Sequence, residues 1–417
     1  MPRLFAAAAL CSTFAFLPAC HHSKMHDDTH MQGEMQKVTH AICVLSATEG
    51  NTVTGWVADN ADDRNIVFAI QDGDIVNSGN STTQWNNARA AMEQLDGVVP
   101  YAVVRGNHDI GSQFDLASRL GNGSPYSQQS TLTGHYENPD HDDWDMRNTY
   151  HTFEAGGQKF MVLTVDISAG SDVVDWANQV IAAHGDHRVI LDTHAYNYDG
   201  GQRFNNADDP DNPGHTHDES RDELLRSPGQ PDAIYNGASY GGQDAQTLWE
   251  NLVSRHPNIA IFISGHQFED FDQFKYHLDE GVNGNDVYEM LVDPQHMANG
   301  GDGWLRLLEF DPDGETVHVK TYSPHRDEWD TAADVYFDIT LSDITRTGDF
   351  NGDGIVNAAD YTVWRDGLGM AYQPEDYGIW SDNFGATASS PPGEVTAVPE
   401  PTVFLLLAAL TACTPFS

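Results

Sequence analysis

Short apolar runs alternate with helical patterns along most of the chain, which predicts β-strands joined by helices. Two of these runs are followed directly by polar residues. Asn65–Ile70 precedes Gly73-Asp74-Ile75-Val76-Asn77, and Val98–Val104 precedes Gly106-Asn107-His108-Asp109. Between them a helix is expected from Ser81, with apolar residues at helical spacing: Trp85, Ala88, Met92 and Leu95. These segments predict a βαβ unit with Asp, Asn and His at the carboxyl edge of its sheet, where ligands of parallel sheets bind.

Further apolar runs extend this pattern. Strands are expected at residues 159–166, 188–192, 258–264 and 287–292, and a late hairpin is expected from 304–310 and 316–322 around a turn at 311–314. The sequence shows no strand pattern before Cys43. Parallel strands followed by a meander predict an α/β protein with two packed sheets and helices outside.

The charge of the chain is unusual. Its 417 residues include 20 Lys and Arg against 63 Asp and Glu, a formal net charge of −43. So acidic a surface repels nucleic acid and anionic membranes, so we expect no nucleic-acid partner. It suits a salty medium rich in divalent ions, and acidity as a solubility device alone is an equally good explanation.

The first 20 residues are typical of an export signal, because Arg3 precedes an apolar stretch that ends near Cys20. Leu17-Pro-Ala-Cys20 is weakly similar to a lipoprotein cleavage box, although simple secretion is favoured over lipidation of Cys20. The apolar run 403–410 is far shorter than the roughly 20 residues of a membrane-spanning helix, so no stable transmembrane anchor is expected. The sequence thus indicates a secreted or surface protein.

Two other segments stand out. Residues 197–244 form a polar insertion that contains Gly214-His215-Thr216-His217. Near the end, residues 349–360 fit a twelve-residue calcium loop with Gly354 at its sharp turn. Its expected calcium ligands are Asp349, Asn351, Asp353, the carbonyl of Ile355, Asn357 and Asp360. A short repeat around Tyr361 and Tyr377 predicts two helices that pack as a pair.

The ordered blocks Gly73-Asp74, Gly106-Asn107-His108-Asp109, His194 after a strand and Gly265-His266 after another resemble the calcineurin-like metallophosphoesterases. The resemblance spans roughly residues 40–340. It implies a four-layer α/β/β/α sandwich that binds two divalent metal ions, Mn, Fe or Zn. It also implies hydrolysis of a phosphomonoester or phosphodiester by attack of metal-bound hydroxide.

Roles follow from the same resemblance. Asp74 corresponds to the carboxylate that bridges the two metals, and Asn107, His194 and His266 correspond to the other ligands of the second metal. His108 corresponds to the histidine that contacts the phosphate and assists the leaving group. Asp109 would orient His108 and hold its tautomer, and Asn77 would have a supporting role.

The ligands of the first metal are incomplete. The family supplies Asp-x-His or Asp-x-Gln after its first strand, and Asp28-Thr29-His30 has these letters without a preceding strand. The family's last block is Gly-His-x-His, but Phe268 stands where its second histidine is expected. The His215 and His217 pair lies too early in the chain and is interpreted as a loop feature. The second metal's ligands are complete.

The C-terminal region has two resemblances of its own. Residues 347–386 resemble a dockerin-type calcium module, which implies a cohesin-like or cell-surface partner. After a linker at 387–397, residues 398–417 begin with Val398-Pro-Glu-Pro401 and resemble a PEP-CTERM sorting tail of exported bacterial proteins. We therefore predict a signal peptide at 1–20, a metallophosphoesterase-like domain at 40–343, and this module and tail.

Two functions fit the sequence. The favoured one is a secreted metal-dependent phosphoesterase. The alternative is a calcium-dependent surface or matrix binding protein whose phosphoesterase-like domain is catalytically impaired. The incomplete first motif favours the alternative, whereas His108 and Asp109 favour the enzyme, because neither is needed merely to hold a fold.

Overall fold

The computed structural model describes residues 39–45, 50–110, 114, 120, 123–137, 146–197, 203, 242–266, 274–342, 344, 348–351, 355–369, 372–374 and 376–385. The predicted signal peptide and sorting tail lie outside these residues, as do Asp28, His30 and the pair His215 and His217. Of the predicted calcium ligands, Asp353 also lies outside them.

The first sheet holds the βαβ unit that the sequence predicts. Its strand order is β13-β12-β11-β1-β2-β3, and β14 pairs with β12. Its strands are β1 (His40–Leu45), β2 (Ile66–Gln71), β3 (Tyr101–Val103), β11 (Leu305–Phe310), β12 (Thr316–Ser323), β13 (Glu328–Asp330) and β14 (Phe337–Thr340). β1, β2 and β3 run parallel, so their carboxyl ends meet at one edge.

The second sheet has the order β4-β5-β6-β7-β8-β10-β9. Its strands are β4 (Leu132–His135), β5 (Thr149–Ala155), β6 (Gln158–Thr164), β7 (Arg188–Ala195), β8 (Ile259–Gly265), β9 (Phe274–Glu280) and β10 (Asp286–Val292). β6, β7, β8 and β10 are parallel. These four strands are the ones that the apolar runs predict.

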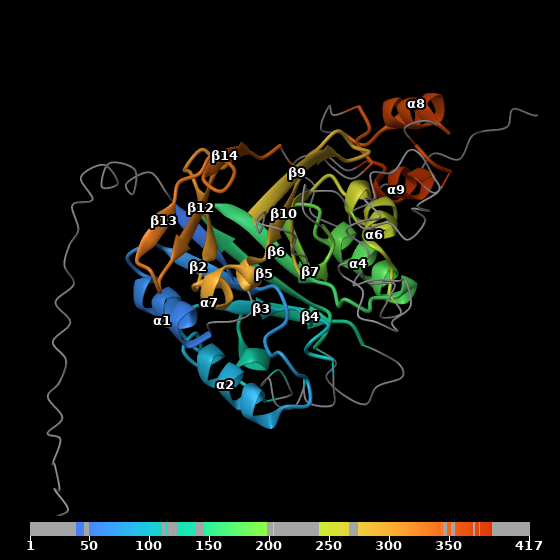
Figure 1. Cartoon of the computed structure of the whole chain (residues 1–417). Helices are drawn as coiled ribbons and strands as arrows, with labels where there is room; N and C mark the ends of the chain where they lie inside the picture. The colour runs from blue at the N-terminus through green and yellow to red at the C-terminus, as the bar shows by residue number, and fades with distance from the viewer. Residues whose placement is uncertain are drawn as a thin grey trace, which may run out of the picture. The chain divides into compact units, whose positions relative to one another are not determined.

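Helices cover the outer face of each sheet (Figure 1). The helices are α1 (Gly50–Asn60) and α2 (Thr82–Met92) against the first sheet, α4 (Ser171–Ala183) and α6 (Ala245–Asn251) against the second, and the short α7 (Ala298–Gly301). Single 3-10 turns lie at Tyr126–Gln128, Val253–Arg255 and Pro294–His296. Side chains from both sheets, such as Phe68 and Ile190, form the apolar layer between them. The described residues thus form two sheets with helices outside, which is the layer order expected.

The predicted helix after the first strand is α2. The hydroxyl of Ser81 caps it by accepting a hydrogen bond from the N–H of Gln84. Trp85, Ala88 and Met92 lie on its buried face, as the spacing predicts. Leu95 is also buried, but it lies in the turn after the helix.

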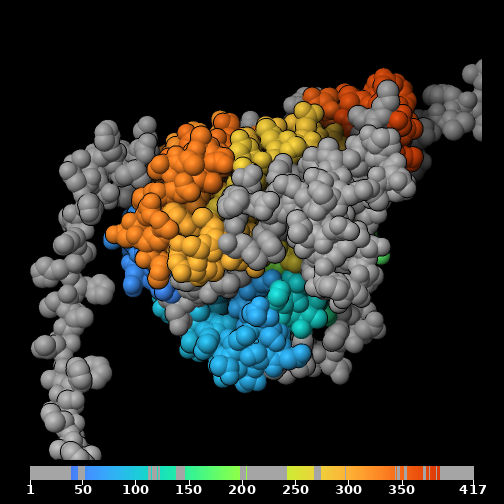
Figure 2. Space-filling model, viewed as in Figure 1, coloured from blue at the N-terminus to red at the C-terminus, as the bar shows by residue number. Residues whose placement is uncertain are grey.

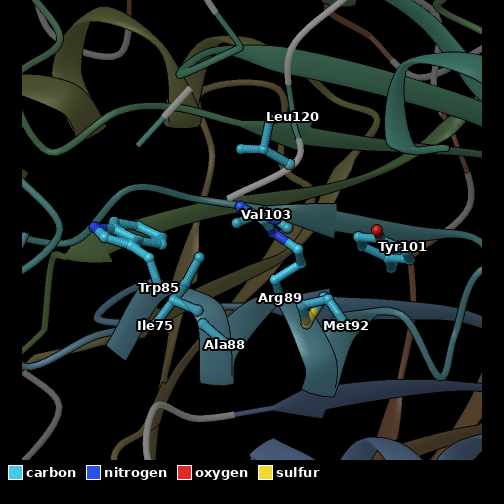
Figure 3. Close-up of a pocket in the computed structure, with 8 residues that line it drawn as sticks. All are labelled: Ile75, Trp85, Ala88, Arg89, Met92, Tyr101, Val103 and Leu120. Carbon is cyan, nitrogen blue, oxygen red and sulfur yellow. The ribbon is translucent and has the colours of Figure 1, made fainter. Parts of the chain in front are cut away.

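A small cavity remains beneath this helix (Figure 3). Side chains of α2 and β3, with Ile75 and Leu120, line it, and none of the predicted metal ligands is among them. The opposite face of α2 belongs to the blue surface in the lower part of Figure 2. Because none of the predicted metal ligands lines this cavity, it is separate from the candidate site.

The strand that the sequence pattern misses is β1, which begins at His40. A buried histidine hides the strand pattern: the His40 ring is 2% exposed and stacks on Phe310 with ring centroids 4.6 Å apart. β1 is a central strand, hydrogen-bonded to β2 on one side and to β11 on the other. The late hairpin is confirmed as β11 and β12.

The C-terminal repeat forms two helices, α8 (Ala358–Gly367) and α9 (Asp376–Asn383). Their repeated aromatic side chains pack together, with ring centroids 6.3 Å apart for Tyr361 and Tyr377 and 5.2 Å apart for Tyr361 and Trp380. The predicted helix pair is thus present. Among the described residues, no helix combines the length and the apolar character needed to cross a bilayer.

Buried histidines make the stability of this fold sensitive to acid. Burial, and to a smaller extent the charge of nearby Arg255, lower the pKa of His256 to about 3. The folded protein therefore keeps His256 neutral, while the unfolded chain protonates it near its ordinary pKa of about 6.5. Above about pH 6.5, His256 is neutral in both states and does not change the free energy of unfolding. As the pH falls from about 6.5 toward 3, the unfolded chain binds a proton that the folded protein does not, so the free energy of unfolding decreases.

We predict that His256→Gln flattens part of this pH dependence, since glutamine can still donate to Asn178, the partner of His256 at 2.7 Å. Between pH 7 and pH 5, wild type should lose about 2 kcal/mol of unfolding free energy relative to the variant. Urea unfolding at both pH values measures this. His277→Gln on exposed β9 is the control, with an expected change below about 0.5 kcal/mol. A pH-independent difference for His256→Gln would contradict the prediction.

Candidate metal centre

The edge where the parallel strands end brings three predicted ligands together. Among the described residues, Asp74, His194 and His266 form a group of buried side chains whose ligand atoms lie within 4.8 Å of one another. Asp74 follows β2 of the first sheet, His194 lies in β7 and His266 follows β8 of the second. The site is thus assembled across the two sheets.

The individual distances fit a shared cation. His194 Nε2 lies 3.2 Å from Asp74 Oδ2 and 3.2 Å from His266 Nδ1. Ligand atoms with bonds of about 2.1 Å to one ion are expected to lie about 3.0 to 3.4 Å apart. Two of the three pairs therefore have the spacing of a coordination shell, and all three ligand atoms lie within 4.8 Å of one another.

Asn107 is the fourth predicted ligand. It lies in the turn after β3, and its Oδ1 atom is buried with no hydrogen-bond partner. Leaving a buried polar atom unsatisfied is costly unless a partner such as an ion or water completes it. An amide oxygen of this kind suits a divalent cation, so Asn107 fits the role that the sequence predicts.

The tautomer of His194 is fixed by the main chain. Its Nδ1 lies 2.7 Å from the carbonyl oxygen of Asp72, a group that can only accept, so Nδ1 carries a proton and donates it. Nε2 is therefore the atom that faces Asp74 and His266. Orientation of a histidine ligand by a carbonyl is a recurrent feature of metal sites.

Asp74 and His194 shift each other's pKa. Burial lowers the pKa of His194, but the Asp74 carboxylate outweighs burial and raises it to about 10. Burial raises the pKa of Asp74, but the imidazoles of His194, His266 and His108 lower it to about 2. Asp74 is thus ionised at neutral pH, and a cation bound here would displace the proton from His194 Nε2.

The loops that carry the ligands contain glycine residues at close contacts and residues with a left-handed backbone conformation. Asp74 and His266 have φ values of 50° and 72°, a region that is uncommon for residues other than glycine. A Cβ on Gly73 would overlap the ring of His194, and one on Gly106 would overlap the carboxylate of Asp74. Such close approach and strain are typical of functional sites.

His108 lies at the exposed end of the turn. Its N–H donates to Asp74 Oδ1 at 2.8 Å, and its Nδ1 lies 3.0 Å from the carbonyl oxygen of Asn77. Nδ1 therefore donates to Asn77, which leaves Nε2 open. Asn77 supports the site through its main chain.

The structure corrects the role predicted for Asp109. Its carboxylate is fully buried and accepts hydrogen bonds from the N–H groups of Val76 and Gly106, at 3.0 and 2.9 Å. Asp109 therefore joins the two loops of the first sheet, while Asn77 orients His108. Burial, and then the Asp74 charge, raise the pKa of Asp109 to about 7.

Asp28 and His30, the predicted ligands of the first metal, lie outside the described residues, so their role stays a prediction. In the sequence they precede β1 (His40–Leu45). The residues that follow β1 are Ser46, Ala47, Thr48 and Glu49, with neither aspartate nor histidine.

Sequence reasoning missed two arginines that form ion pairs with buried carboxylates, one of them next to the site. Arg105 directly precedes the Gly106 turn, and its Nη2 lies 3.0 Å from Asp166 Oδ1 and 2.9 Å from Oδ2, at the end of β6. Arg203, inside the long insertion, lies 2.6 Å from Glu289 of β10 and stacks over Trp249. Neither belongs to a motif; an arginine directly before the Gly-Asn-His-Asp block was the available signal for Arg105.

Comparison with known protein families identifies the family of the chain. The sequence profile of the calcineurin-like phosphoesterases matches residues 28–335, so the chain belongs to this family. Members of this family typically bind two divalent metal ions.

Individual relatives are distant. The chain is 28% identical over 278 residues to the uncharacterized protein YvnB of Bacillus subtilis (strain 168), a match that covers 65% of this chain and 18% of YvnB. It therefore spans less than a fifth of that relative.

Solved structures give weak matches. A dimetal phosphatase from Danio rerio has 13% identity and a TM-score of 0.42, over 73% of this chain and all of that chain. Purple acid phosphatase PPD1 from yellow lupin (Lupinus luteus) seeds has 13% identity and a TM-score of 0.41, over 73% of this chain and 54% of that chain.

The Arg105–Asp166 pair yields a prediction, because it joins the Gly106 turn to the second sheet. Arg105→Met leaves the Asp166 carboxylate, 3% exposed, without its close cation. We expect the unfolding free energy to fall by about 3 kcal/mol, as for a buried pair that loses one partner.

The matched control is Arg147→Met, because Arg147 lies 4.0 Å from the same carboxylate. Its expected loss is below about 1 kcal/mol. Denaturation followed by tryptophan fluorescence measures both. Equal losses in the two variants would show that Arg105 is not the dominant partner.

Proposed function

We propose that this chain is a metal-dependent hydrolase of phosphomonoesters or phosphodiesters. The observation that carries the proposal is the convergence of Asp74, His194 and His266, next to the unpartnered amide oxygen of Asn107. These four side chains offer one carboxylate, two imidazoles and one amide oxygen, a set that Mn, Fe and Zn accept. Membership of the phosphoesterase family supports the same reaction.

A divalent cation held by these residues supplies positive charge for the phosphoryl oxygens and lowers the pKa of bound water. The chain's own contribution begins with Asp74, whose position is fixed by the N–H of His108. His108 Nδ1 donates to the carbonyl of Asn77. His108 can therefore give a proton to the leaving oxygen only from an Nε2 that is protonated as well, as in an imidazolium. The carbonyl of Asp72 keeps His194 Nε2 directed at the shared ligand position.

The first test is turnover of 4-nitrophenyl phosphate and bis(4-nitrophenyl) phosphate by the full chain with Mn²⁺. His108→Ala should lower kcat by about 10² to 10⁴-fold, because a general acid contributes that much. Chelation of the metal should abolish turnover, and added Mn²⁺ should restore it. His277→Ala on β9 is the control and should keep wild-type kcat.

The outcome that contradicts this function is turnover that survives His108→Ala at the level of His277→Ala. No turnover by wild type, together with calcium-dependent binding to another macromolecule, would favour the alternative of a catalytically impaired binding protein. The incomplete first-metal motif is the feature that supports this alternative.

We also propose that the C-terminal region binds calcium and that the protein is exported to the medium or cell surface. The loop supports the calcium site, because Asp360 accepts hydrogen bonds from the N–H groups of Asn351 and Asn357 and so closes the loop. Asp349 is 1% exposed at its other end. The N-terminal apolar segment and Val398-Pro-Glu-Pro401 support export, and the dockerin-like repeat supports a cohesin-like or cell-surface partner.

The calcium proposal predicts one equivalent of Ca²⁺ bound by the full chain in isothermal titration. Asp349→Ala should abolish this binding, because it removes the first oxygen ligand of the loop. Asp366→Ala is the control, since Asp366 is exposed on α8 and pairs with Arg365 at 2.7 Å. Unchanged Ca²⁺ binding by Asp349→Ala would place calcium elsewhere.

A further inference from the structure

We propose that two copies of this chain associate through strand β9, so that the second sheets of the two copies join into one continuous sheet. This association goes beyond the proposed function and does not depend on it. β9 (Phe274–Glu280) is the last strand in the order of the second sheet, so one of its sides has no neighbour among the described strands (Figure 1). A strand in this place offers N–H and C=O groups to another chain.

β9 lacks most of the features that protect an edge strand from such pairing. Its ladder with β10 continues over all seven residues without a bulge, and the strand contains no proline. Tyr276, His277 and Leu278 are exposed in succession, so both faces of the strand reach solvent at its middle. Natural edge strands are usually very short, bulged, or interrupted by proline or charged residues. The middle of β9 is thus accessible to a partner strand.

An apolar patch lies beside the open side of β9, and we define it as Tyr276, Leu278 and Phe337. Tyr276 is 41% exposed and Leu278 is 45% exposed. The ring of Tyr276 stacks on that of Phe337 in β14, with centroids 4.3 Å apart, which holds the Tyr276 ring in place. Single exposed apolar side chains are ordinary, but neighbours that form one patch are typical of interaction surfaces.

The turn after β9 determines which main-chain groups of the strand point outward. The N–H of Gly281 donates to the carbonyl of Asn285 at 2.8 Å and closes the turn between β9 and β10. In an antiparallel ladder, facing pairs that are hydrogen-bonded alternate with pairs that are not. Counting back in twos from Gly281, the odd-numbered residues of β9 bond to β10. The N–H and C=O groups of Tyr276 and Leu278 therefore point to the open side.

The sequence of β9 is complementary to itself in the antiparallel direction. About a two-fold axis at His277, Tyr276 of each copy lies opposite Leu278 of the other, and Lys275 lies opposite Asp279. Apolar pairs and pairs of opposite charge at facing positions both stabilise antiparallel strands, and the two-fold symmetry provides each of them twice. An axis at Tyr276 or at Leu278 would lose both charge pairs. This complementarity favours a second copy of the chain as the partner and fixes the register.

The charged residues of these pairs are already held in position. Lys275 Nζ lies 3.2 Å from Asp334 Oδ2, and Asp279 Oδ2 lies 2.7 Å from Arg203 Nη2. An ammonium group has three donors and a carboxylate accepts several hydrogen bonds, so each can contact a second partner. In the dimer, Asp279 lies between Arg203 of its own chain and Lys275 of the second copy.

The net charge of −43 opposes the association of two copies. This repulsion acts at long range, and salt screens it beyond about 8 Å at physiological ionic strength. The main-chain hydrogen bonds and apolar contacts of the strand pair act at shorter range. We therefore expect the dimer to become tighter as salt rises from about 0.01 M to about 0.5 M. An association held by the charge pairs alone would become weaker.

Sedimentation velocity of the full chain, with a chelator present, measures the oligomeric state. Between about 1 µM and about 100 µM protein, wild type should change from monomer to dimer. Leu278→Lys should stay monomeric, because it places a lysine opposite Tyr276 of the other copy. Val98→Lys is the matched control, since Val98 is 53% exposed in the turn before β3, and it should dimerise like wild type.

Two charge variants test the register. Lys275→Glu places a glutamate opposite Asp279 twice, and Asp279→Lys places a lysine opposite Lys275 twice. Each variant alone should dimerise at least tenfold more weakly than wild type, because like charges at facing positions repel. Mixed in equal amounts, the two variants should form a heterodimer, because both facing pairs then have opposite charge. Thermal unfolding of each variant checks that it is folded.

Two outcomes would overturn the proposal. Wild type that stays monomeric over this concentration range at about 0.5 M salt would leave the edge of β9 to a strand of a different protein. A dimer that survives Leu278→Lys and both charge variants would place the contact elsewhere on the surface. Neither outcome depends on phosphoester turnover, so failure of the dimer and failure of the proposed function are distinguishable.

Discussion

The contact between His194 and Asp74 is the interaction on which the site depends. It joins the two sheets at the ends of β7 and β2, with 3.2 Å between Nε2 and Oδ2 and with both side chains almost fully buried. A charge at such depth is stable only beside an opposite charge. Each sheet supplies one partner, so the site exists only where the two sheets pack together.

This contact explains the local backbone. The loop after β2 can approach His194 only because Gly73 has no side chain, and the turn after β3 can approach Asp74 only because Gly106 has none. The left-handed conformation of Asp74 then aims its carboxylate across the gap. Such strain persists when surrounding contacts hold it, and the hydrogen bonds of Asp109 to Val76 and Gly106 provide them.

Much of this was readable from sequence because the site lies at strand ends that long apolar runs mark. Ile66–Gln71 and Ile259–Gly265 are almost continuously apolar, and the ligands follow directly. β1 escaped this reasoning because a polar residue, His40, occupies a buried position by stacking on Phe310. The local pattern of apolar and polar residues does not reveal that a side chain stacks on an aromatic ring of a distant strand.

The role of Asp109 was misassigned for a related reason. A carboxylate next to a histidine in sequence suggests a pair, but adjacent residues of a turn direct their side chains apart. The Asp109 carboxylate points into the protein toward two N–H groups, and the His108 ring points outward to Asn77. Arg105 likewise reveals its role only once β6 brings Asp166 beside it.

The site therefore divides into a buried half and an exposed half. Asp74, His194 and His266 are held by both sheets, so their positions are set by the same contacts that stabilise the fold. His108 and Ile110 lie on a surface turn, where side chains can change at little cost to stability. The predicted metal ligands, which need fixed positions, therefore lie in the buried half of the site.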